Sequence, residues 1–278
     1  MSTSSTWLPT EPDLATALSH YPDPLLALSK ADMPAIVLRG AYNMTHGDQL
    51  IDRFLEKGLM RDPHDTETDD KRTRIDIGTS LGNMGHDKEA FLSHAVTTHA
   101  LFEHLFDGFD NPVDTIYDAL QTLAVGKTVK VAHEPDGQMY GPAIFRIHYT
   151  HHSYKPHIDH VTLREKRFNY AVTRFEHQFA GVLVLRNAVY EGFSPQGILH
   201  QCLWAPEIQP HIAENTFHQY AAENGIGNCQ VNLEAGDLYF FNTRCIHEVR
   251  AVQGNNPRIV LAVFIGYSPD DPEVFVWS

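Results

Sequence analysis

Three residues, His157, Asp159 and His247, have the side-chain types and spacing expected of a metal site. His157 and Asp159 flank Ile158, and in an extended segment alternate side chains point to the same face. Both can therefore approach one metal ion while Ile158 turns away into packing. His247 lies in the alternating segment 245–249 and is expected to supply the third ligand. Two histidines and a carboxylate on one face of a metal leave three positions open, an arrangement typical of non-haem iron(II) sites that bind a cosubstrate and O2.

Two arginines could bind the carboxylate groups of such a cosubstrate. Arg258 follows His247 beyond a predicted turn at 255–257, and an antiparallel return would bring it to the metal side of the sheet. Iron(II), one aspartate, the dianion 2-oxoglutarate and Arg258 together carry no net charge, which a buried site requires. Arg146, in a predicted strand at 143–149, shares its parity with His148. It is expected either to bind 2-oxoglutarate or the substrate, or to form a structural salt bridge.

Other histidines and one cysteine lie near these residues in the sequence. His160 would face away from His157, so we expect it behind the ligands or at the surface. His148, His151 and His152 are expected in a solvated loop, with an adventitious metal patch as the alternative. Cys245 shares the parity of His247 and is interpreted as an ordinary buried thiol.

The elements that must position these residues change in character along the chain. Apolar residues at three- and four-residue spacing predict helices in the first 125 residues, at 12–28, 47–58, 88–106 and 113–123. The clearest is 88–106. A short apolar run predicts a strand at 35–39, and the charged segment 61–72 an exposed loop. From residue 126 onward, β-branched and aromatic segments alternate with turn residues and predict strands at 128–131, 143–149, 179–186, 198–203, 229–233, 237–242, 245–249, 259–266 and 274–277.

This pattern predicts an α+β fold. A mainly helical part, 1–125, would pack on a double-stranded β-helix (jelly roll) at 126–278, the two forming a single domain, 1–278. Two further segments are expected near the pocket. Residues 77–82 are glycine-rich and are expected to form a loop over it. Residues 168–179 are interpreted as either a mobile lid or a plain surface helix.

Composition limits the class of protein. The chain has 278 residues, 42% of them hydrophobic, and a net charge of −14. Such a negative charge disfavours nucleic acid and anionic membranes as partners. Three cysteines are too few for a disulfide framework, residues 1–12 lack the pattern of a secretory signal, and no apolar run is long enough to span a membrane. We therefore expect a cytoplasmic protein that acts on a small molecule; the oligomeric state stays open.

The C-terminal half resembles a known family. The His-X-Asp motif, the distal His247 and the following Arg258 resemble the iron(II)/2-oxoglutarate-dependent oxygenase superfamily. Residues 135–143, 235–242, 254–258 and the final Trp277-Ser278 are similar to the carrier-independent halogenases of welwitindolinone-type alkaloid pathways. The resemblance implies iron(II), 2-oxoglutarate and O2 as cofactor and cosubstrates, and a free-standing natural-product or amino-acid-like substrate.

One departure from that family concerns the reaction. The halogenases have a small residue, typically glycine, at the carboxylate position, and chloride occupies the space. This sequence has Asp159 there. The resemblance together with Asp159 implies a hydroxylase rather than a halogenase.

Alternatives to hydroxylation stay open at this point. The same iron chemistry could end in desaturation, cyclisation or epimerisation, because the outcome depends on how the substrate is placed. A jelly-roll binding protein without catalysis and a zinc hydrolase are weaker candidates, since His/Asp/His also suits zinc.

Overall fold

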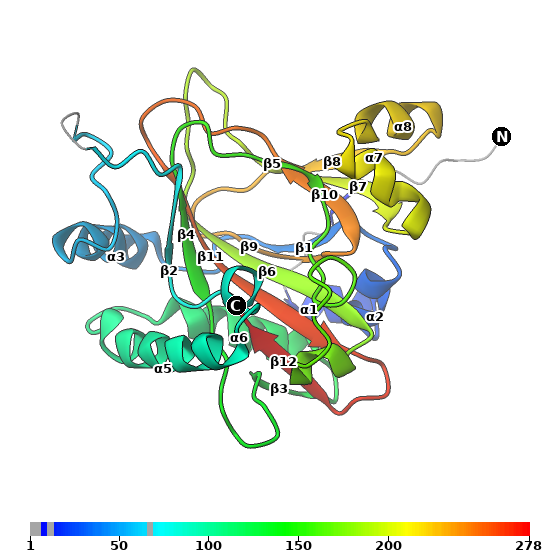
Figure 1. Ribbon diagram of the computed structural model, residues 1–278, viewed down its shortest axis with the longest axis horizontal. Helices are drawn as coiled ribbons and strands as arrows, with labels where there is room; N and C mark the ends of the chain where they lie inside the picture. The colour runs from blue at the N-terminus through cyan, green and yellow to red at the C-terminus, as the bar shows by residue number, and fades with distance from the viewer. Residues whose placement is uncertain (1–6, 10–13, 66–68) are drawn as a thin grey trace.

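The computed structural model describes residues 7–9, 14–65 and 69–278, and it contains helices and two mostly antiparallel sheets (Figure 1). The predicted absence of a secretory signal concerns residues 1–12, of which all but 7–9 lie outside the described residues. No helix among the described residues is both long and apolar enough to cross a membrane.

The larger sheet has eight strands. Its main order is β1-β9-β6-β11-β12-β3, and β4 pairs with both β11 and β2. Every pairing is antiparallel except that of β3 with β12. The strands are β1 (Ala35–Leu38), β2 (Arg74–Ile77), β3 (Thr128–Val131), β4 (Ile144–His148), β6 (His177–Arg186), β9 (Leu238–Asn242), β11 (Arg258–Tyr267) and β12 (Glu273–Trp277).

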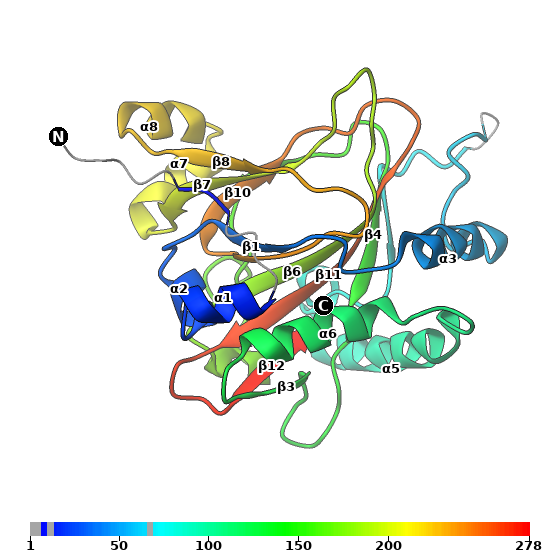
Figure 2. The same ribbon diagram turned by 180° about the vertical axis from the view of Figure 1, so that it is seen from behind.

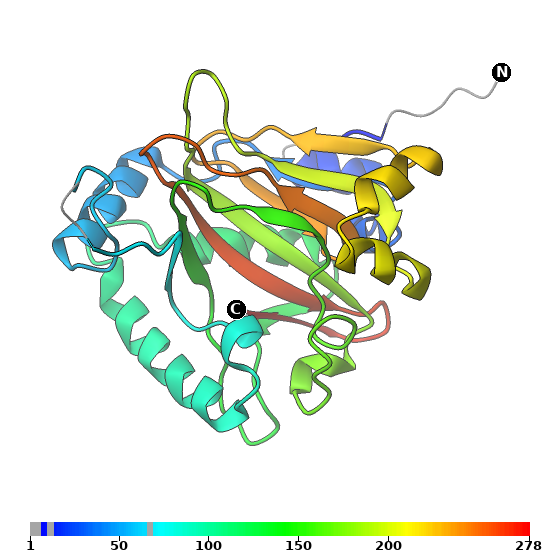
Figure 3. The same cartoon turned by 45° about the horizontal axis from the view of Figure 1, so that its top comes forward.

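The smaller sheet has four antiparallel strands in the order β5-β10-β7-β8. They are β5 (Tyr154–His157), β10 (Cys245–Val249), β7 (Gly197–Leu203) and β8 (Asn228–Val231). One buried apolar cluster joins the two sheets, with Val182 and Phe241 from the larger and Leu199 and Val231 from the smaller. The sheets therefore face each other, as Figure 3 shows, in an arrangement consistent with the expected jelly roll.

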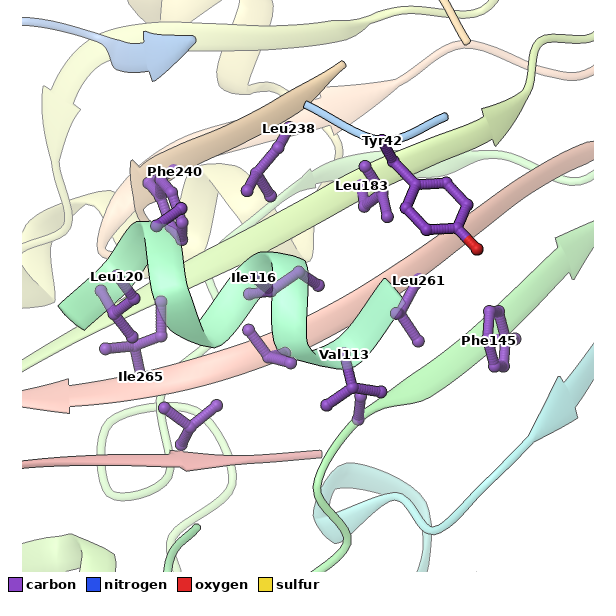
Figure 4. Close-up of a cluster of buried hydrophobic side chains, with 14 of the residues drawn as sticks. Tyr42, Val113, Ile116, Leu120, Phe145, Leu183, Leu238, Phe240, Leu261 and Ile265 are labelled. Carbon is purple, nitrogen blue, oxygen red and sulfur yellow. The ribbon is translucent and has the colours of Figure 1, made fainter. Parts of the chain in front are cut away.

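Helices cover the other face of the larger sheet (Figure 2). They are α1 (Leu14–His20), α2 (Pro24–Ser29), α3 (Met44–Glu56), α5 (Lys88–Leu105) and α6 (Pro112–Leu123). Helix α6 shows why they pack there: Val113, Ile116 and Leu120 lie on one face and meet β-strand residues such as Phe240 and Ile265 (Figure 4). Burying this stripe fixes the helical layer to the back of the sheet. The short helix α4 (Leu81–Met84) lies elsewhere, with Leu81 in a separate buried cluster that includes Tyr140 and Trp277.

A second helical segment lies between β7 and β8. It contains the 3₁₀ turn η2 (Pro206–Ile208), α7 (Gln209–Ala213) and α8 (Phe217–Glu223). Trp204, Ile208 and Phe217 of this segment are buried together with Ile158 and Ile246, which come from the smaller sheet and its extension. We call residues 204–227 the outer segment, because it packs on the face of the smaller sheet that points away from the larger one.

The nine predicted strands between 128 and 277 are all present, within two residues at most of the expected ends. The single helix predicted at 12–28 is wrong in its described part, which has two short helices. Pro22 and Pro24 interrupt the helix, and the Asp23 side chain caps the start of α2 by accepting a hydrogen bond from the Leu26 amide. Within the mainly helical part, 1–125, strand β1 matches the strand predicted at 35–39, and β1 and β2 both belong to the larger sheet.

Candidate metal centre

The smaller sheet brings the three predicted ligands together. His157 ends β5, and His247 lies directly opposite it on β10, with ring centroids 4.2 Å apart. Asp159 follows β5, and its backbone amide donates to Thr243 O at 3.1 Å, in the turn that precedes β10. As predicted, Ile158 turns away and is buried under the outer segment. Strand alternation and one cross-strand pair therefore assemble the site.

The donor atoms of these residues converge. Asp159 Oδ2 lies 3.7 Å from His157 Nε2 and 3.4 Å from His247 Nε2. One donor atom from each of the three residues lies within 4.8 Å of the others, as a shared metal ion requires. The donor set of two imidazoles and a carboxylate fits iron(II) and also zinc.

The other ring nitrogens fix the orientation of both histidines. His157 Nδ1 lies 2.7 Å from Lys155 O, and His247 Nδ1 lies 2.9 Å from Cys245 O. Because a carbonyl oxygen only accepts, Nδ1 must carry the hydrogen in each ring. The Nε2 lone pairs are then free for a metal, as is usual for metal-binding histidines. Burial lowers the pKa of His247, which keeps this ring in the neutral form that a ligand needs.

Arg164 holds the carboxylate of Asp159, a role that its position in the sequence did not reveal. Its guanidinium donates to Asp159 Oδ1 and to Ile158 O. Burial by itself raises the pKa of Asp159, but the closeness of His157 and His247 to the carboxylate brings it well below its usual range. Asp159 is therefore a carboxylate, with Oδ2 toward the histidines and Oδ1 held from outside.

Arg258 is buried in the same region without an acidic partner. Its exposed fraction is 4%, and its Nε has no hydrogen-bond partner among the described residues. It donates weakly to His148 Nδ1 at 3.4 Å, and His148 Nε2 in turn lies 3.0 Å from the Tyr154 hydroxyl. Burial and the charge of Arg258 lower the pKa of His148, so the ring is neutral and accepts from Arg258. A buried cation without a counter-ion is costly, and an anionic ligand would remove that cost.

Arg146 points into the same space. On β4 it has the same parity as His148, and both line one cavity with Arg258. Its Nε is buried without a hydrogen-bond partner, and no acidic side chain in the described part of the chain forms an ion pair with it. The nearby Asp76 is instead bound by Arg74, at 2.8 Å from Nε to Oδ1. The expected structural salt bridge of Arg146 is therefore not formed.

Two cavities meet at His157 and Asp159, and His247 lines the inner one. The inner one lies between the sheets, is largely apolar and contains Arg258 and Tyr239. The outer one is polar and includes Arg74, Arg167 and Ser80. His157, Asp159, Arg146, Tyr154 and Phe264 line both. The candidate metal position thus lies between a smaller, largely apolar cavity and a larger, polar one.

The neighbouring histidines only partly match the predictions. The solvated loop is wrong for His148, which is buried in β4, and His152 stacks on it with ring centroids 4.5 Å apart. Strand alternation in β4 turns the His148 side chain inward. The prediction grouped His148 with His151 and His152, which follow the strand. His160 lines the outer cavity, and its Nδ1 accepts a hydrogen bond from the backbone amide of Thr162. Cys245 is a buried thiol, as expected.

The two segments considered as parts of the pocket differ. Ser80, Leu81 and Gly82 line the outer cavity, as expected for this segment. The loop predicted at 77–82 is only partly confirmed, because Ile77 ends β2 and Leu81 begins α4. Residues 168–179 do not form the plain surface helix that was one of the two expectations, because β6 begins at His177. They contain a single 3₁₀ turn, η1 (Ala171–Arg174), and Tyr170 and Val172 are buried in a cluster with Phe91 and Trp277.

The fold and the site correspond to a known class. The sequence model of the family described as the carrier-protein-independent halogenase WelO5 matches residues 13–278, nearly the whole chain. The protein therefore belongs to this family, and with it to the iron(II)/2-oxoglutarate-dependent oxygenase superfamily. None of the curated protein sequences matches the chain.

Solved structures support the same fold. An N-substituted L-amino acid dioxygenase from Burkholderia ambifaria AMMD has a TM-score of 0.56 and 15% sequence identity, over 91% of this chain and 90% of that one. The structure of that dioxygenase in complex with alpha-KG has a TM-score of 0.55 and 14% identity over the same shares. HygX from Streptomyces hygroscopicus, with nickel and 2-oxoglutarate bound, is more distant, with a TM-score of 0.49 and 10% identity over 90% of this chain and 88% of that one.

Proposed function

We propose that this protein is an iron(II)- and 2-oxoglutarate-dependent dioxygenase that hydroxylates a C–H bond of a free-standing small molecule. The observation that supports it best is the pairing of two features in one cavity. The donor atoms of His157, Asp159 and His247 converge, and the guanidinium of Arg258 is buried beside them without an acidic partner.

Each residue would have a separate task. His157, Asp159 and His247 would hold iron(II), which with 2-oxoglutarate and O2 supplies the oxidising power for breaking an unactivated C–H bond. Arg258 would bind the far carboxylate of 2-oxoglutarate in the inner cavity with charge-assisted hydrogen bonds. Arg146, at the junction of the cavities, would bind a second carboxylate. The substrate would then occupy the outer cavity, which Phe264 and Trp277 make partly apolar.

Asp159 is the reason to propose hydroxylation within a halogenase family. Its carboxylate fills the position that a small residue leaves open to chloride in the halogenases which the sequence resembles. Arg164 already holds this carboxylate, and Asp159 Oδ2 lies beside Nε2 of both histidines. Desaturation, ring closure or epimerisation would use the same residues. Which of these reactions follows depends on the placement of the substrate.

The test is anaerobic binding of 2-oxoglutarate to the iron(II)-loaded protein, followed by the visible charge-transfer band of the chelate. We expect the band in the wild type and a roughly 10- to 100-fold higher Kd for 2-oxoglutarate in Arg258→Gln, because charge-assisted hydrogen bonds are lost. Arg250→Gln, which removes an exposed arginine, is the matched control. Tight zinc binding without any affinity for 2-oxoglutarate would instead favour a hydrolase or a binding protein.

A further inference from the structure

A second group of metal-binding side chains lies on the opposite face of the smaller sheet. His200 comes from β7, Glu248 from β10 and His218 from α8. Glu248 Oε1 lies 3.0 Å from His200 Nε2, and Glu248 Oε2 lies 3.3 Å from His218 Nε2. One donor atom from each residue lies within 4.8 Å of the others. The group therefore has the same composition as the site at Asp159, two imidazoles and a carboxylate.

Strand alternation separates the two groups. His247 and Glu248 are neighbours on β10, so their side chains point to opposite faces. His247 faces the larger sheet, whereas Glu248 faces the outer segment, as does Ile246 in the apolar cluster beneath that segment. His200 and His218 do not line the cavity in which Arg258 lies, whereas Glu248 borders both that cavity and the surface cavity beside His218. The second group connects two strands with a helix.

The environment of His200 favours a ligand at its Nε2 atom. The ring is only 3% exposed, and it packs edge-on against Phe217, with centroids 4.9 Å apart. Its Nδ1 is buried with no hydrogen-bond partner in the part of the chain that the structure describes. Nε2 lies next to Glu248 and is therefore the nitrogen of this ring that can bind a metal ion. His218 is 63% exposed, and together with Glu248 it lines a surface cavity with room for a water molecule.

We propose that His200, His218 and Glu248 form a second divalent-cation site, of the zinc type, with three protein ligands and one water. Zinc is commonly bound by two histidines and a carboxylate, and nitrogen-rich sites select zinc, nickel or copper over magnesium or calcium. A metal there would link the outer segment to the strand that carries His247. The proposal is independent of the proposed reaction, because it uses no residue of that site.

The experiment measures zinc binding in a His157→Ala/Asp159→Ala variant, which lacks the first site and keeps β10 intact. Equilibrium dialysis with metal analysis is expected to give one zinc per chain. Adding His218→Ala should weaken this binding at least tenfold, roughly the lower limit for losing a residue of a metal site. Gln219→Ala, the next exposed position on α8, should leave it unchanged. Cobalt(II) in place of zinc should show the visible bands of a four-coordinate site.

Two results would overturn the proposal: no zinc bound to the double variant, or equal affinity with and without His218→Ala. Circular dichroism verifies that each variant is folded. If the double variant does not fold, the wild type and His218→Ala are compared directly. Two metals per chain in the wild type and one in His218→Ala would support the second site, and equal numbers would exclude it.

Discussion

At the scale of single residues, Asp159 has the strongest bearing on the type of reaction. Its two oxygens are used differently: Oδ2 faces the histidines, and Oδ1 accepts from Arg164. In the proposed site, a carboxylate placed in this way would be the third ligand and would occupy the position of a halide. Under that proposal, the choice between hydroxylation and chlorination depends on the Asp159 side chain.

We expect Asp159→Gly to lose hydroxylation and to bind iron(II) more weakly, because one of the three ligands is gone. The vacated space could then admit chloride. The measurement is conversion of 2-oxoglutarate to succinate, with product analysis in the presence and absence of chloride. His157→Ala and His247→Ala should abolish turnover and serve as references. Hydroxylation at the wild-type rate in Asp159→Gly would show that Asp159 is not a ligand.

Arg146 is the second residue with a testable assignment. We expect Arg146→Gln to raise the Kd for 2-oxoglutarate roughly 10-fold or more in the absence of substrate, because a charge-assisted hydrogen bond is lost. Titration of the anaerobic iron(II) protein measures this directly. Unchanged affinity for 2-oxoglutarate, combined with a higher KM for the substrate, would assign the guanidinium to the substrate instead.

At the scale of elements, the site depends on the pairing of β5 with β10. One face of this pair packs against the outer segment, and the other face lines the inner cavity. Ile158 and Ile246 are buried under the outer segment, while the flanking His157, Asp159 and His247 face the cavity. Packing on one face thus holds the ligands on the other. The outer segment, although distant from the cavity, contributes to the position of the ligands.

We expect Ile158→Ala to lower the free energy of unfolding by about 2 to 5 kcal/mol, because it leaves a void in a buried cluster. Metal affinity should fall as well, since the strand between His157 and Asp159 loses its support. Chemical denaturation and metal titration measure the two effects. Val96→Ala, at an exposed site on α5, is the control. A loss of stability with unchanged metal affinity would show that the ligands do not depend on this packing.

The sequence predicts most of the strands and the longer helices but misses the short strands β2 and β5. Stripes such as Phe91, Ala95 and Phe102 identify α5, and β-branched runs identify β6 and β11. Strands β2 and β5 each have four residues, and β5 contains Lys155 and Pro156, which are unfavourable in strands. His157 and Asp159 can be proposed as ligands from their local spacing, and His247 from its place in the alternating segment 245–249. Arg164 and Tyr154 each lie five residues from Asp159, but their contacts depend on the path of the chain around β5, which no sequence pattern predicts.

At the scale of the whole molecule, buried neutral histidines make stability depend on pH. Burial lowers the pKa of His152 to about 4 and that of His148 well below 6.5. Below pH 6.5 the unfolded chain takes up protons at these positions, whereas the folded protein does so only at lower pH. Their contribution to stability is therefore full above about pH 6.5 and is lost as the pH falls toward 4.

We expect the free energy of unfolding of the metal-free protein to decrease by up to about 1.4 kcal/mol per pH unit for each such histidine. Denaturation curves between pH 7 and pH 4 measure this slope. His152→Asn should reduce the slope, and His151→Asn at the adjacent exposed position is the control. An unchanged slope in His152→Asn would mean that His152 is protonated in the folded protein.

The direct pairing of His157 with His247 has a consequence for folding. The two residues lie far apart in the sequence, so their contact closes a long loop, and closing it costs conformational entropy. Both residues can bind one metal ion only after this loop has closed. A metal that binds only the folded state stabilises it by about 2.7 kcal/mol at a concentration 100 times its Kd. Since β10 is synthesised long after β5, the proposed metal site is complete only once both strands exist. A chain with these two strands out of register would not form that site, so metal bound there would report correct folding.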